Sequence, residues 1–509
     1  MFSRYFSKSS VNLSQGNLDN RLVFAVSCLV SVWLIAIDPV INRDAIIYLR
    51  TADAFLESGW LAGQAVFDRP LLPFIFAGIH KLTGLSMVHA GQLVITVFYG
   101  LLATSFVATI RVMGGDRRVQ LLAAILILSH PMLNTSRSDI MRDPAYWALT
   151  ILAFRELLLY ARNPVMRHQL RWFFYIALAT LFRFEGAFFA ALAPLAIIAV
   201  GDKSTRWRDG LRLMIFPAIA GIGLLALIMI YQAYLFPGEH LFKDISAYWR
   251  NFKQVTGEFK TIIGNPAQAW LESHSKEDAQ MAAIGALMAV LVLNICRALT
   301  WPYVALLVWG GLKKQLDRVT PRDFSLIKAH LLISLLYLVI FMLTKRFMLE
   351  RYSGIVALYL LILLPFILNG LWNTGRSWGG KATVIVLLLG MSLDTLHNRD
   401  SEKAFIRSAT EWIRIELPKD ASITTNSSYI AYFSEREFYW GNREYQFKVA
   451  DLEDIRQKWQ TTDYLVVMMK RNEISDWREF LAQNNLVEIE TFPGKSRGKI
   501  AIVAVPKTR

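Results

Sequence analysis

Long runs of apolar residues, separated by short polar loops, restrict the fold of this sequence more than any other feature. The first run covers residues 22–41, and further runs follow along the chain as far as about residue 396. Hydrophobic residues make up 54% of the 509 residues, and they are concentrated in these runs. A run of about 20 apolar residues is long enough to cross the hydrocarbon core of a bilayer. The sequence therefore predicts a polytopic α-helical membrane protein.

About eleven transmembrane helices are predicted from these runs. They are placed near residues 22–41, 88–110, 119–133, 145–161, 171–183, 187–200, 212–235, 282–311, 324–343, 353–371 and 382–396. Residues 171–200 also fit one long helix interrupted by RFEG (183–186), but that choice would send the basic loop at 203–212 to the outside, so two helices are preferred. The run at 282–311 contains Pro302 and is long for one crossing, which predicts a kinked helix.

The formal net charge of +15 is explained by topology, because Lys and Arg residues are spread over the short loops. These loops, together with the basic N-terminus (residues 1–21), are predicted to be cytoplasmic. No single basic stripe is present, so a nucleic-acid partner is not expected. Cys28 and Cys296 both lie in apolar runs, which excludes a disulfide framework and a cysteine-based metal site.

The large polar segments all fall on the extracytoplasmic side of this map. They are residues 42–87, with a juxtamembrane helix at 43–57 and an interfacial helix at 69–84, the loop 129–144, the turn 183–186, the long loop 236–281, the stretch 344–352 and the C-terminal residues 399–509. From residue 400 the composition becomes that of a soluble α/β domain. Helices are predicted at 402–417 and 473–485, and strands at 421–426, 462–469, 486–492 and 498–505. The chain thus divides into a cytoplasmic N-terminus, a membrane domain at 22–398 and a C-terminal domain.

Acidic residues beside arginines mark three places on the extracytoplasmic side. Asp44 opens the helix at 43–57 in phase with Tyr48, Asp143 lies in SRSDIMRDP with Arg142, and RFEG supplies Arg183 and Glu185. Asp44 and Asp143 could each be a helix N-cap, a role that aspartate favours and that needs no chemistry. Ionisable groups at a membrane surface otherwise face a polar cavity or a partner. A polar substrate site is the alternative.

Cations follow on the same side. Lys345, Arg346 and Arg351 stand in TKRFMLERY beside Tyr352, and Arg297 lies deeper in an apolar run. Such residues could pair with anionic lipid headgroups in general, or hold the phosphate of a lipid-linked substrate.

The order of these features resembles the polyprenyl-phosphate-dependent glycosyltransferases of the GT-C superfamily, and within it family 39, the protein mannosyltransferase and aminoarabinose lipid A transferase group. The matching positions are Asp44, Arg69-Pro70 with Lys81 and Gly84, Asp143, the loop 236–281, Arg351-Tyr352 and Leu364-Pro365. The resemblance covers residues 22 to about 370. It departs from the family at Arg43-Asp44, where many members have adjacent acidic residues, and at Asp68-Arg69-Pro70, where aminoarabinose transferases have Lys-Pro-Pro. The sugar and the acceptor are therefore not carried over.

The resemblance implies a GT-C-like fold in the plasma (inner) membrane of a bacterium. It also implies transfer of a sugar from a polyprenyl-phosphate donor to a hydroxyl of a glycan, lipid or protein, with inversion. Asp44 would act as general base and Asp143 as the second catalytic carboxylate. The expected substrate-binding residues are Tyr48, Arg69, Arg142, Arg183, Glu185, Arg297, Lys345, Arg346, Arg351 and Tyr352. Among these, Arg351 and Lys345 are the first choices for neutralising the departing phosphate.

Three questions stay open at this point. A divalent metal is not indicated by ligand spacing, although His80, His130 and His240 could approach the carboxylates. A transporter or flippase of lipid-linked glycans is the rival class; the absence of an inverted repeat and the large external domain speak against it. A ligase-like transferase that uses a diphosphate-linked glycan would lack the early Asp helix and its Arg-Pro partner.

Overall fold

The computed structural model describes residues 16–38, 40–234, 277–316, 319–373, 378–394, 403–438, 440, 447–494 and 498–506. Most of the long external loop predicted at 236–281 and most of the N-terminal segment lie outside these residues; the last three residues of the predicted loop, 279–281, are the start of helix α14 (Ala279–Leu299). The chain forms two compact units. Unit 1 contains residues 1–28, 97–134 and 142–394, and unit 2 contains residues 29–96, 135–141 and 395–509.

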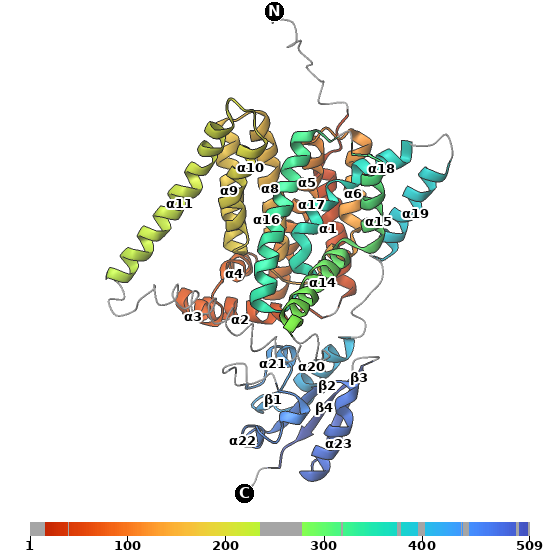
Figure 1. The fold of residues 1–509 in the computed structure, drawn as a ribbon. Coiled ribbons are helices and arrows are strands. Elements are labelled where there is room, and N and C mark those ends of the chain that lie inside the picture. Colours follow the sequence, from red (N-terminus) through yellow and green to blue (C-terminus); the bar gives the residue numbers. More distant parts are fainter. Residues whose placement is uncertain are drawn as a thin grey trace, which may run out of the picture. The chain divides into compact units, whose positions relative to one another are not determined.

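Unit 1 is a bundle of helices (Figure 1). Its helices are α6 (Arg117–Ser129), α7 (Pro131–Asn134), α8 (Asp143–Arg162), α9 (Met166–Phe182), α10 (Gly186–Val200), α11 (Arg206–Tyr234), α14 (Ala279–Leu299), α15 (Trp301–Leu312), α16 (Pro321–Lys345), the 3-10 turn η3 (Glu350–Ser353), α17 (Gly354–Leu361), α18 (Leu364–Asn373) and α19 (Gly379–Asp394). The start of α1 (Asn20–Ile37) and the end of α5 (Met87–Val112) also belong to it. Apolar runs became helices, as their length predicted.

Each predicted crossing coincides with a helix or a broken pair of helices. Residues 171–200 form two helices, since α9 ends at Phe182 and α10 begins at Gly186, so the preferred interpretation is confirmed. The kink predicted at 282–311 is a break at Thr300, whose φ of 70° ends α14 two residues before Pro302. Among the described residues, five helices are long and apolar enough to span a membrane, or six if η3–α17 and α18, bent by 43°, count as one. The number of crossings remains a prediction.

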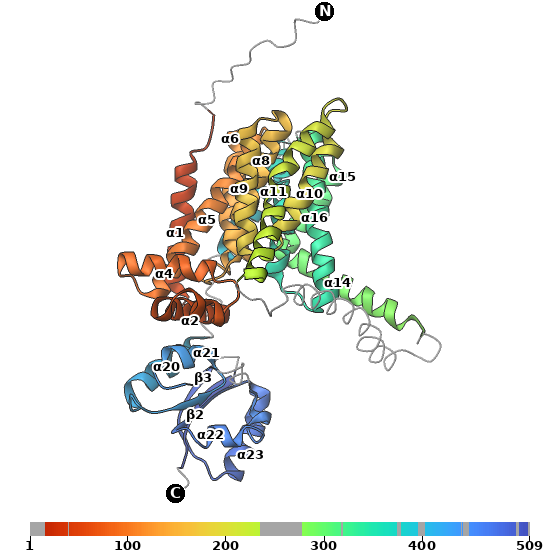
Figure 2. The same cartoon turned by 90° about the vertical axis from the view of Figure 1, so that its left-hand side faces the viewer.

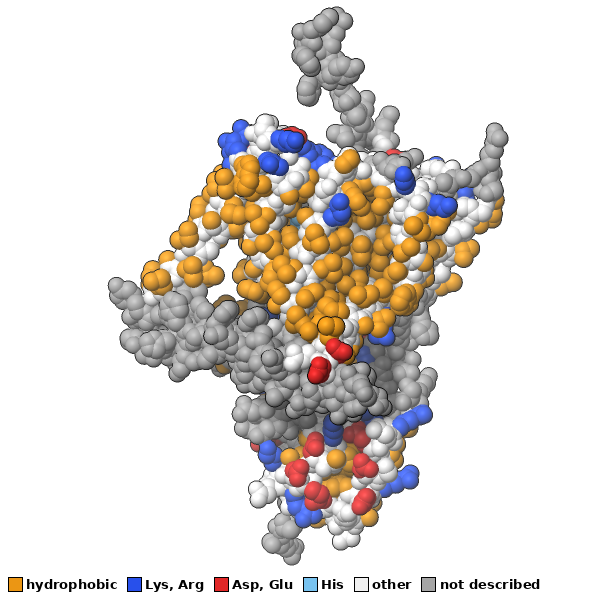
Figure 3. Space-filling model, in the orientation of Figure 1, with side chains coloured by type: hydrophobic (Ala, Val, Ile, Leu, Met, Phe, Trp, Pro, Cys, Tyr) orange, Lys and Arg blue, Asp and Glu red, His pale blue; other side chains and the backbone are white. Residues whose placement is uncertain are grey.

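One end of the unit 1 bundle carries Lys and Arg side chains, some of them paired with carboxylates. Arg162, at the last turn of α8, pairs with Asp323 at 2.6 Å, and Arg322 pairs with Asp202 at 2.9 Å. Figure 3 shows hydrophobic side chains over the sides of this bundle and Lys and Arg side chains at the end where α10 passes into α11. Because α8 runs the length of the bundle, about 30 Å for a helix of this size, Asp143 lies at the opposite end from this basic one.

Unit 2 begins with three helices that follow α1 in the chain. They are α2 (Arg43–Ser58), α3 (Trp60–Val66) and α4 (Leu71–Thr83), and α2 and α4 confirm the helices predicted at 43–57 and 69–84. Gly59 (φ 83°) joins α2 to α3, and Gly84 (φ 73°) ends α4 in the left-handed conformation typical of a glycine C-cap. These short helices pack on one another, with the rings of Phe55 and Phe74 4.2 Å apart.

The C-terminal part of unit 2 is a four-stranded sheet with the order β1-β2-β4-β3. The strands are β1 (Ile423–Thr425), β2 (Tyr464–Met469), β3 (Glu488–Gly494) and β4 (Gly498–Ala504); β1 and β2 are parallel, and β4 is antiparallel to both neighbours. Helix α20 (Ala404–Glu416) packs on one face and α23 (Ile474–Gln483) on the other (Figure 2). Alternation along β2 sends Leu465 and Val467 to the α23 face and Val466 to the α20 face.

All the strands and both longer helices of this part were predicted from the sequence. The short helices α21 (Ser428–Phe433) and α22 (Arg456–Trp459), and the 3-10 turns η6 (Val449–Asp451) and η7 (Arg471–Glu473), were not. Segments this short carry too few residues for a helical period to show.

Candidate functional site

Three of the predicted site residues form a buried ionic cluster at the start of α8 and the turn between α9 and α10. Arg183 donates from Nη1 to Asp143 Oδ1 at 2.7 Å and from Nε to Glu185 Oε1 at 2.9 Å, and a further hydrogen bond joins its Nη2 to the same Glu185 oxygen. The side chains of Arg183, Asp143 and Glu185 are 11%, 6% and 8% exposed. One guanidinium thus bridges two carboxylates, a geometry that lysine could not reproduce.

Aromatic residues surround this cluster. The Tyr337 hydroxyl, from α16, donates to Glu185 Oε1 at 2.7 Å. The Arg183 guanidinium lies 5.1 Å from the ring centroid of Tyr352 and 5.9 Å from that of Tyr146. Arg351 lies 5.4 Å from the Tyr352 ring. Helices α8 and α16, the α9–α10 turn and η3 therefore meet around Arg183.

The partners of Glu185 favour its ionised form in spite of its burial. Burial alone would raise the pKa of Glu185, but the Arg183 guanidinium and the hydrogen bonds from Arg183 and Tyr337 hold the pKa of its carboxyl below the usual value.

The backbone at the turn between α9 and α10 is closely packed, since a Cβ on Gly186 would lie 2.7 Å from the Thr180 nitrogen. Glycine at this position lets the chain turn directly from α9 into α10.

The helix-cap interpretation of Asp143 is wrong in this structure. Helix α8 begins at Asp143 itself, and Arg142 occupies the N-cap position without a side-chain cap bond. The helix starts one residue earlier than the Asp-Pro pattern suggested, so the Asp143 carboxylate is directed to Arg183.

The remaining cations predicted on this side differ in exposure. Arg346 ends α16 in the left-handed conformation (φ 58°), which is uncommon for a residue with a side chain, and its Nε is buried without a hydrogen-bond partner. Lys345 and Arg297 are exposed. Arg351 and Tyr352, half-buried in η3, are thus the predicted residues that the structure brings to the ionic cluster.

Asp44 lies in unit 2, on the first turn of α2, and is half-buried. The N-cap of this helix is Asn42, so the cap interpretation of Asp44 is also wrong. The start of α2 is fixed by residues 135–141. Asn42 Oδ1 accepts from the Ile140 backbone N–H at 3.0 Å, and Asp38 Oδ2 accepts from the Ser138 hydroxyl at 2.6 Å. The helix that carries Asp44 is therefore held by the segment between α7 and α8.

Two other predicted residues of unit 2 have different environments. Tyr48 is buried, with its ring edge-on to Phe67 at 5.3 Å between centroids. Arg69 is exposed and pairs with Asp68 at 3.6 Å. The Arg69 guanidinium therefore lies at the surface, whereas the Tyr48 ring is buried.

The α2 helix also binds the C-terminal part of unit 2. The Tyr432 hydroxyl of α21 donates to Asp53 Oδ2 at 2.5 Å, and Arg50 lies 3.9 Å from the ring centroid of Trp440. Burial raises the pKa of the Asp53 carboxyl, while the hydrogen bond from Tyr432 acts in the opposite direction. These partners are 379 residues apart for the Asp53 pair, so no local pattern could have revealed them.

Within the described residues, no group of three or more His, Cys, Asp or Glu side chains is arranged to hold a metal ion. His130 is fully buried and stacks on Tyr303, with ring centroids 5.8 Å apart. His80 bonds through Nδ1 to the Leu85 carbonyl at 2.6 Å. His240 lies outside the described residues.

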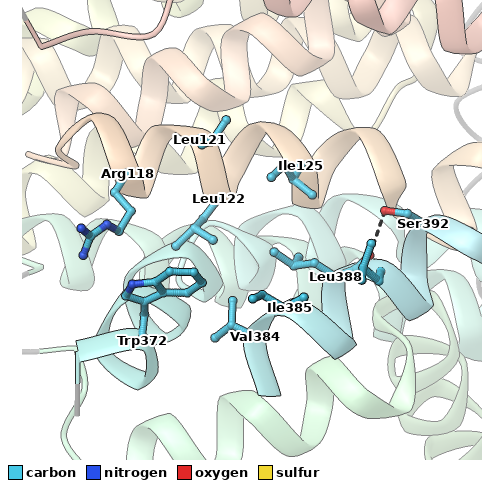
Figure 4. Close-up of a pocket in the computed structure, with 10 residues that line it drawn as sticks. Arg118, Leu121, Leu122, Ile125, Trp372, Val384, Ile385, Leu388 and Ser392 are labelled. Atoms are coloured by element: carbon cyan, nitrogen blue, oxygen red, sulfur yellow. Dashed lines mark hydrogen bonds between the residues drawn. The ribbon is translucent and has the colours of Figure 1, made fainter. Parts of the chain in front are cut away.

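An apolar groove of about 380 Å³ lies elsewhere in unit 1, between α6, α18 and α19 (Figure 4). Leu122, Ile125 and Leu388 are among its walls, and Arg118 stands at one end above the Trp372 ring at 6.0 Å. No predicted site residue lines it. Its chemistry suits a hydrocarbon chain and offers nothing for a proton transfer.

Comparison with known proteins identifies the fold. No protein-family model and no curated protein matches the sequence. Among solved structures, the oligosaccharyltransferase of Archaeoglobus fulgidus superposes with a TM-score of 0.50 at 14% identity, over 87% of this chain and 67% of that one. ArnT from Cupriavidus metallidurans bound to undecaprenyl phosphate gives 0.44 at 11% identity, over 96% and 98%. The arabinofuranosyltransferase AftD from Mycobacteria gives 0.45 at 14% identity, over 97% and 40%.

The chain therefore has the fold of the GT-C glycosyltransferases, a class of polytopic membrane proteins. This confirms the fold resemblance that the ordered motifs of the sequence suggested, together with the mostly helical architecture and the small C-terminal sheet.

Proposed function

We propose that this protein is a membrane glycosyltransferase that moves a sugar from a polyprenyl-phosphate donor to a hydroxyl of an acceptor on the extracytoplasmic side of a bacterial plasma membrane. The observation that supports it most is the buried Asp143–Arg183–Glu185 cluster beside Arg351 and Tyr352, on a GT-C fold. An ionic network enclosed in an otherwise apolar bundle is expensive, and such groups are usually functional.

Asp44 is the proposed general base. Glycosyl transfer needs a group that takes the proton of the acceptor hydroxyl as its oxygen attacks the anomeric carbon. The bond from that carbon to the phosphate oxygen breaks as the new bond forms. A carboxylate on the first turn of a short, rigidly held helix is suited to this role. The N-cap of this helix is Asn42, so Asp44 has no capping role. A well-placed base contributes roughly a hundredfold to ten-thousandfold.

Arg351 is the proposed stabiliser of the departing polyprenyl phosphate. Its guanidinium can hold two phosphate oxygens at once, and its half-buried position beside Tyr352 strengthens the interaction relative to water. Arg346, Lys345, Arg297 and Arg69 are the further cations in this proposal, the last on the first external loop.

Asp143 is the second proposed catalytic carboxylate, and it would orient a hydroxyl of the sugar or acceptor. Arg183 already donates hydrogen bonds from Nη1 to one Asp143 oxygen and from Nε to Glu185. Arg183 and Glu185 therefore act as positioning residues that fix Asp143 and Tyr337 in place.

The predicted orientation agrees with this assignment. Asp143 begins α8, and the helix ends at Arg162 beside the basic loops. Under the positive-inside rule, the basic end is cytoplasmic and the cluster lies toward the outside. A lipid-linked monosaccharide donor on the outer side of the membrane could reach the Asp143 cluster. The reaction there would not depend on nucleotide sugars, whose pool is cytoplasmic.

The test is turnover of labelled polyprenyl-phosphate sugars by the purified full-length protein in lipid nanodiscs. Wild type is compared with Asp44→Asn and with Glu57→Gln, an exposed carboxylate at the other end of the same helix. We expect one donor to be consumed, a loss of about a hundredfold or more in Asp44→Asn with donor binding retained, and no loss in Glu57→Gln.

Equal turnover by Asp44→Asn would remove the base assignment. If wild type binds a donor but never consumes it, and instead moves it across a vesicle membrane, the transporter class replaces the transferase.

A further inference from the structure

Unit 2 contains a second cavity, which none of the roles above uses. It has a volume of about 800 Å³ and lies between the start of α2 and the C-terminal sheet. Its walls come from residues 40–43, 46, 403, 405–406, 426–429, 447–448 and 468–473. The first external loop and the C-terminal domain therefore build this cavity together.

The cavity joins an apolar wall to a strongly basic rim. Ile46, Phe405 and Met468 represent the apolar part. The charged lining residues are Arg43, Lys403, Lys448, Lys470, Arg471 and Glu473. Five cations thus face one carboxylate, and Glu473 already accepts from the Lys470 backbone N–H at 2.9 Å. This combination fits a ligand with an anionic group and an apolar body.

The position of the cavity in the fold also favours a ligand site. It lies at the carboxyl ends of the adjacent parallel strands β1 and β2, the edge where α/β sheets commonly bind ligands. Asn426 fixes this edge, because its Oδ1 accepts from Met468 N at 2.8 Å and its Nδ2 donates to the Met468 carbonyl at 2.9 Å. These hydrogen bonds fix the end of β2, and the basic residues Lys470 and Arg471 follow it directly.

We propose that this cavity holds the acceptor, and that the acceptor is a phosphorylated glycolipid. Its phosphate would bind the Lys470–Arg471 side, and its apolar part would lie along Phe405 and Ile46. Arg43 lines the cavity and Asp44 is the next residue on the same first turn, so an acceptor bound here is held by the helix that carries the proposed base. This inference rests on the proposed function and assigns the C-terminal domain the selection of the acceptor.

Binding to the full-length protein in nanodiscs tests the proposal without any turnover. The probe is a fluorescent glycolipid carrying one phosphate, compared with the same lipid after phosphatase treatment and with inorganic phosphate. The variant is Lys470→Gln with Arg471→Gln. The matched control is Lys419→Gln with Arg478→Gln, two exposed cations of the same domain that do not line the cavity.

We expect the cavity variant to bind the phosphorylated lipid about tenfold or more weakly, and the control to bind it as wild type does. The dephosphorylated lipid should bind weakly to all three proteins. Unchanged binding by the cavity variant, or equal binding of both lipids to wild type, would overturn the proposal. So would inorganic phosphate binding as tightly as the phosphorylated lipid.

A second readout separates this inference from the proposed function. Hydrolysis of the donor by water needs no acceptor, so the cavity variant should keep it and lose only transfer to the phosphorylated lipid. Equal transfer to both lipids by wild type would defeat the acceptor assignment and leave the transferase intact. No consumption of any donor would defeat the proposed function, whatever the binding data show.

Discussion

At the scale of single residues, Arg183 shows what the sequence could and could not predict. Its place between two apolar runs, beside Glu185, indicated a functional or structural charge. Its pairing with Asp143, forty residues earlier in the chain, came from the packing of α8 against α9, which no local pattern contains. The acidic and basic residues of the candidate site were predictable one by one, and their partners were not. Tyr337 and Tyr432 were missed because a tyrosine in an apolar helix carries no signal until its hydroxyl finds a partner.

Replacing Arg183 with lysine tests whether one guanidinium holds the cluster together. Lysine keeps the charge but cannot bridge both carboxylates, so at least one buried carboxylate loses its partner. We expect Arg183→Lys to lower the free energy of unfolding by about 2 kcal/mol or more, visible as a Tm several degrees lower in a thermal unfolding scan.

Arg407→Lys is the matched control, since Arg407 is 56% exposed and pairs at 2.8 Å with Glu411, which is itself 50% exposed. Surface pairs contribute little. If both variants lose the same stability, the Asp143–Arg183–Glu185 bridge is not the strong interaction that its burial suggests.

At the scale of elements, hydrophobic period and length predicted the helices and strands well, because each one buries a face that its own residues define. The contact between α2 and the C-terminal part of unit 2, which includes α21, is of another kind. It rests on Asp53 with Tyr432 and on Arg50 with Trp440, pairs from segments that are far apart in the chain. Sequence reasoning placed Arg50 and Asp53 on a polar stripe of α2 and could go no further, since the partner element was too short to predict.

The Asp53–Tyr432 contact leads to a prediction about pH. Burial raises the pKa of the Asp53 carboxyl above the ordinary value of an aspartate, so the folded state binds this proton more tightly than the unfolded state. The stabilising contribution is complete at low pH and is lost as the pH rises through the raised pKa. Asparagine keeps an oxygen for the Tyr432 hydroxyl and avoids the charge. We expect Asp53→Asn to raise Tm by roughly 1–3 °C at pH 7.5 and to leave it unchanged near pH 4.

Thermal unfolding of both proteins across that pH range is the measurement, with Asp420→Asn, an exposed carboxylate of the C-terminal domain, as control. A Tm for Asp53→Asn below that of wild type at pH 7.5 would mean that the ionised carboxylate stabilises this contact.

At the scale of the whole molecule, the sequence predicts a membrane domain followed by an α/β domain. In the structure the chain forms two compact units, which divide α1 and α5 between them. The segment that carries α2, α3 and α4 belongs to the same unit as the C-terminal domain. Composition marks where apolar runs give way to a soluble domain, but it cannot show that an early loop packs with a late domain. That grouping is what gives the cavity at the start of α2 its two sides.

Topology is the remaining property of the whole molecule that an experiment can decide. The positive-inside rule predicts that residues 203–212 are cytoplasmic and that the C-terminal domain is outside. Cys28 and Cys296 are the only cysteines of the chain, so a background with both changed to alanine allows single cysteines to be introduced at Ser204 and Ser475, both exposed. In intact cells, a maleimide that cannot cross the plasma membrane should label Ser475→Cys and not Ser204→Cys, and both should react once the membrane is opened. Labelling of Ser204→Cys alone in intact cells would invert the map. It would also move the Asp143 cluster to the cytoplasmic side, where a nucleotide-sugar donor becomes the better substrate class.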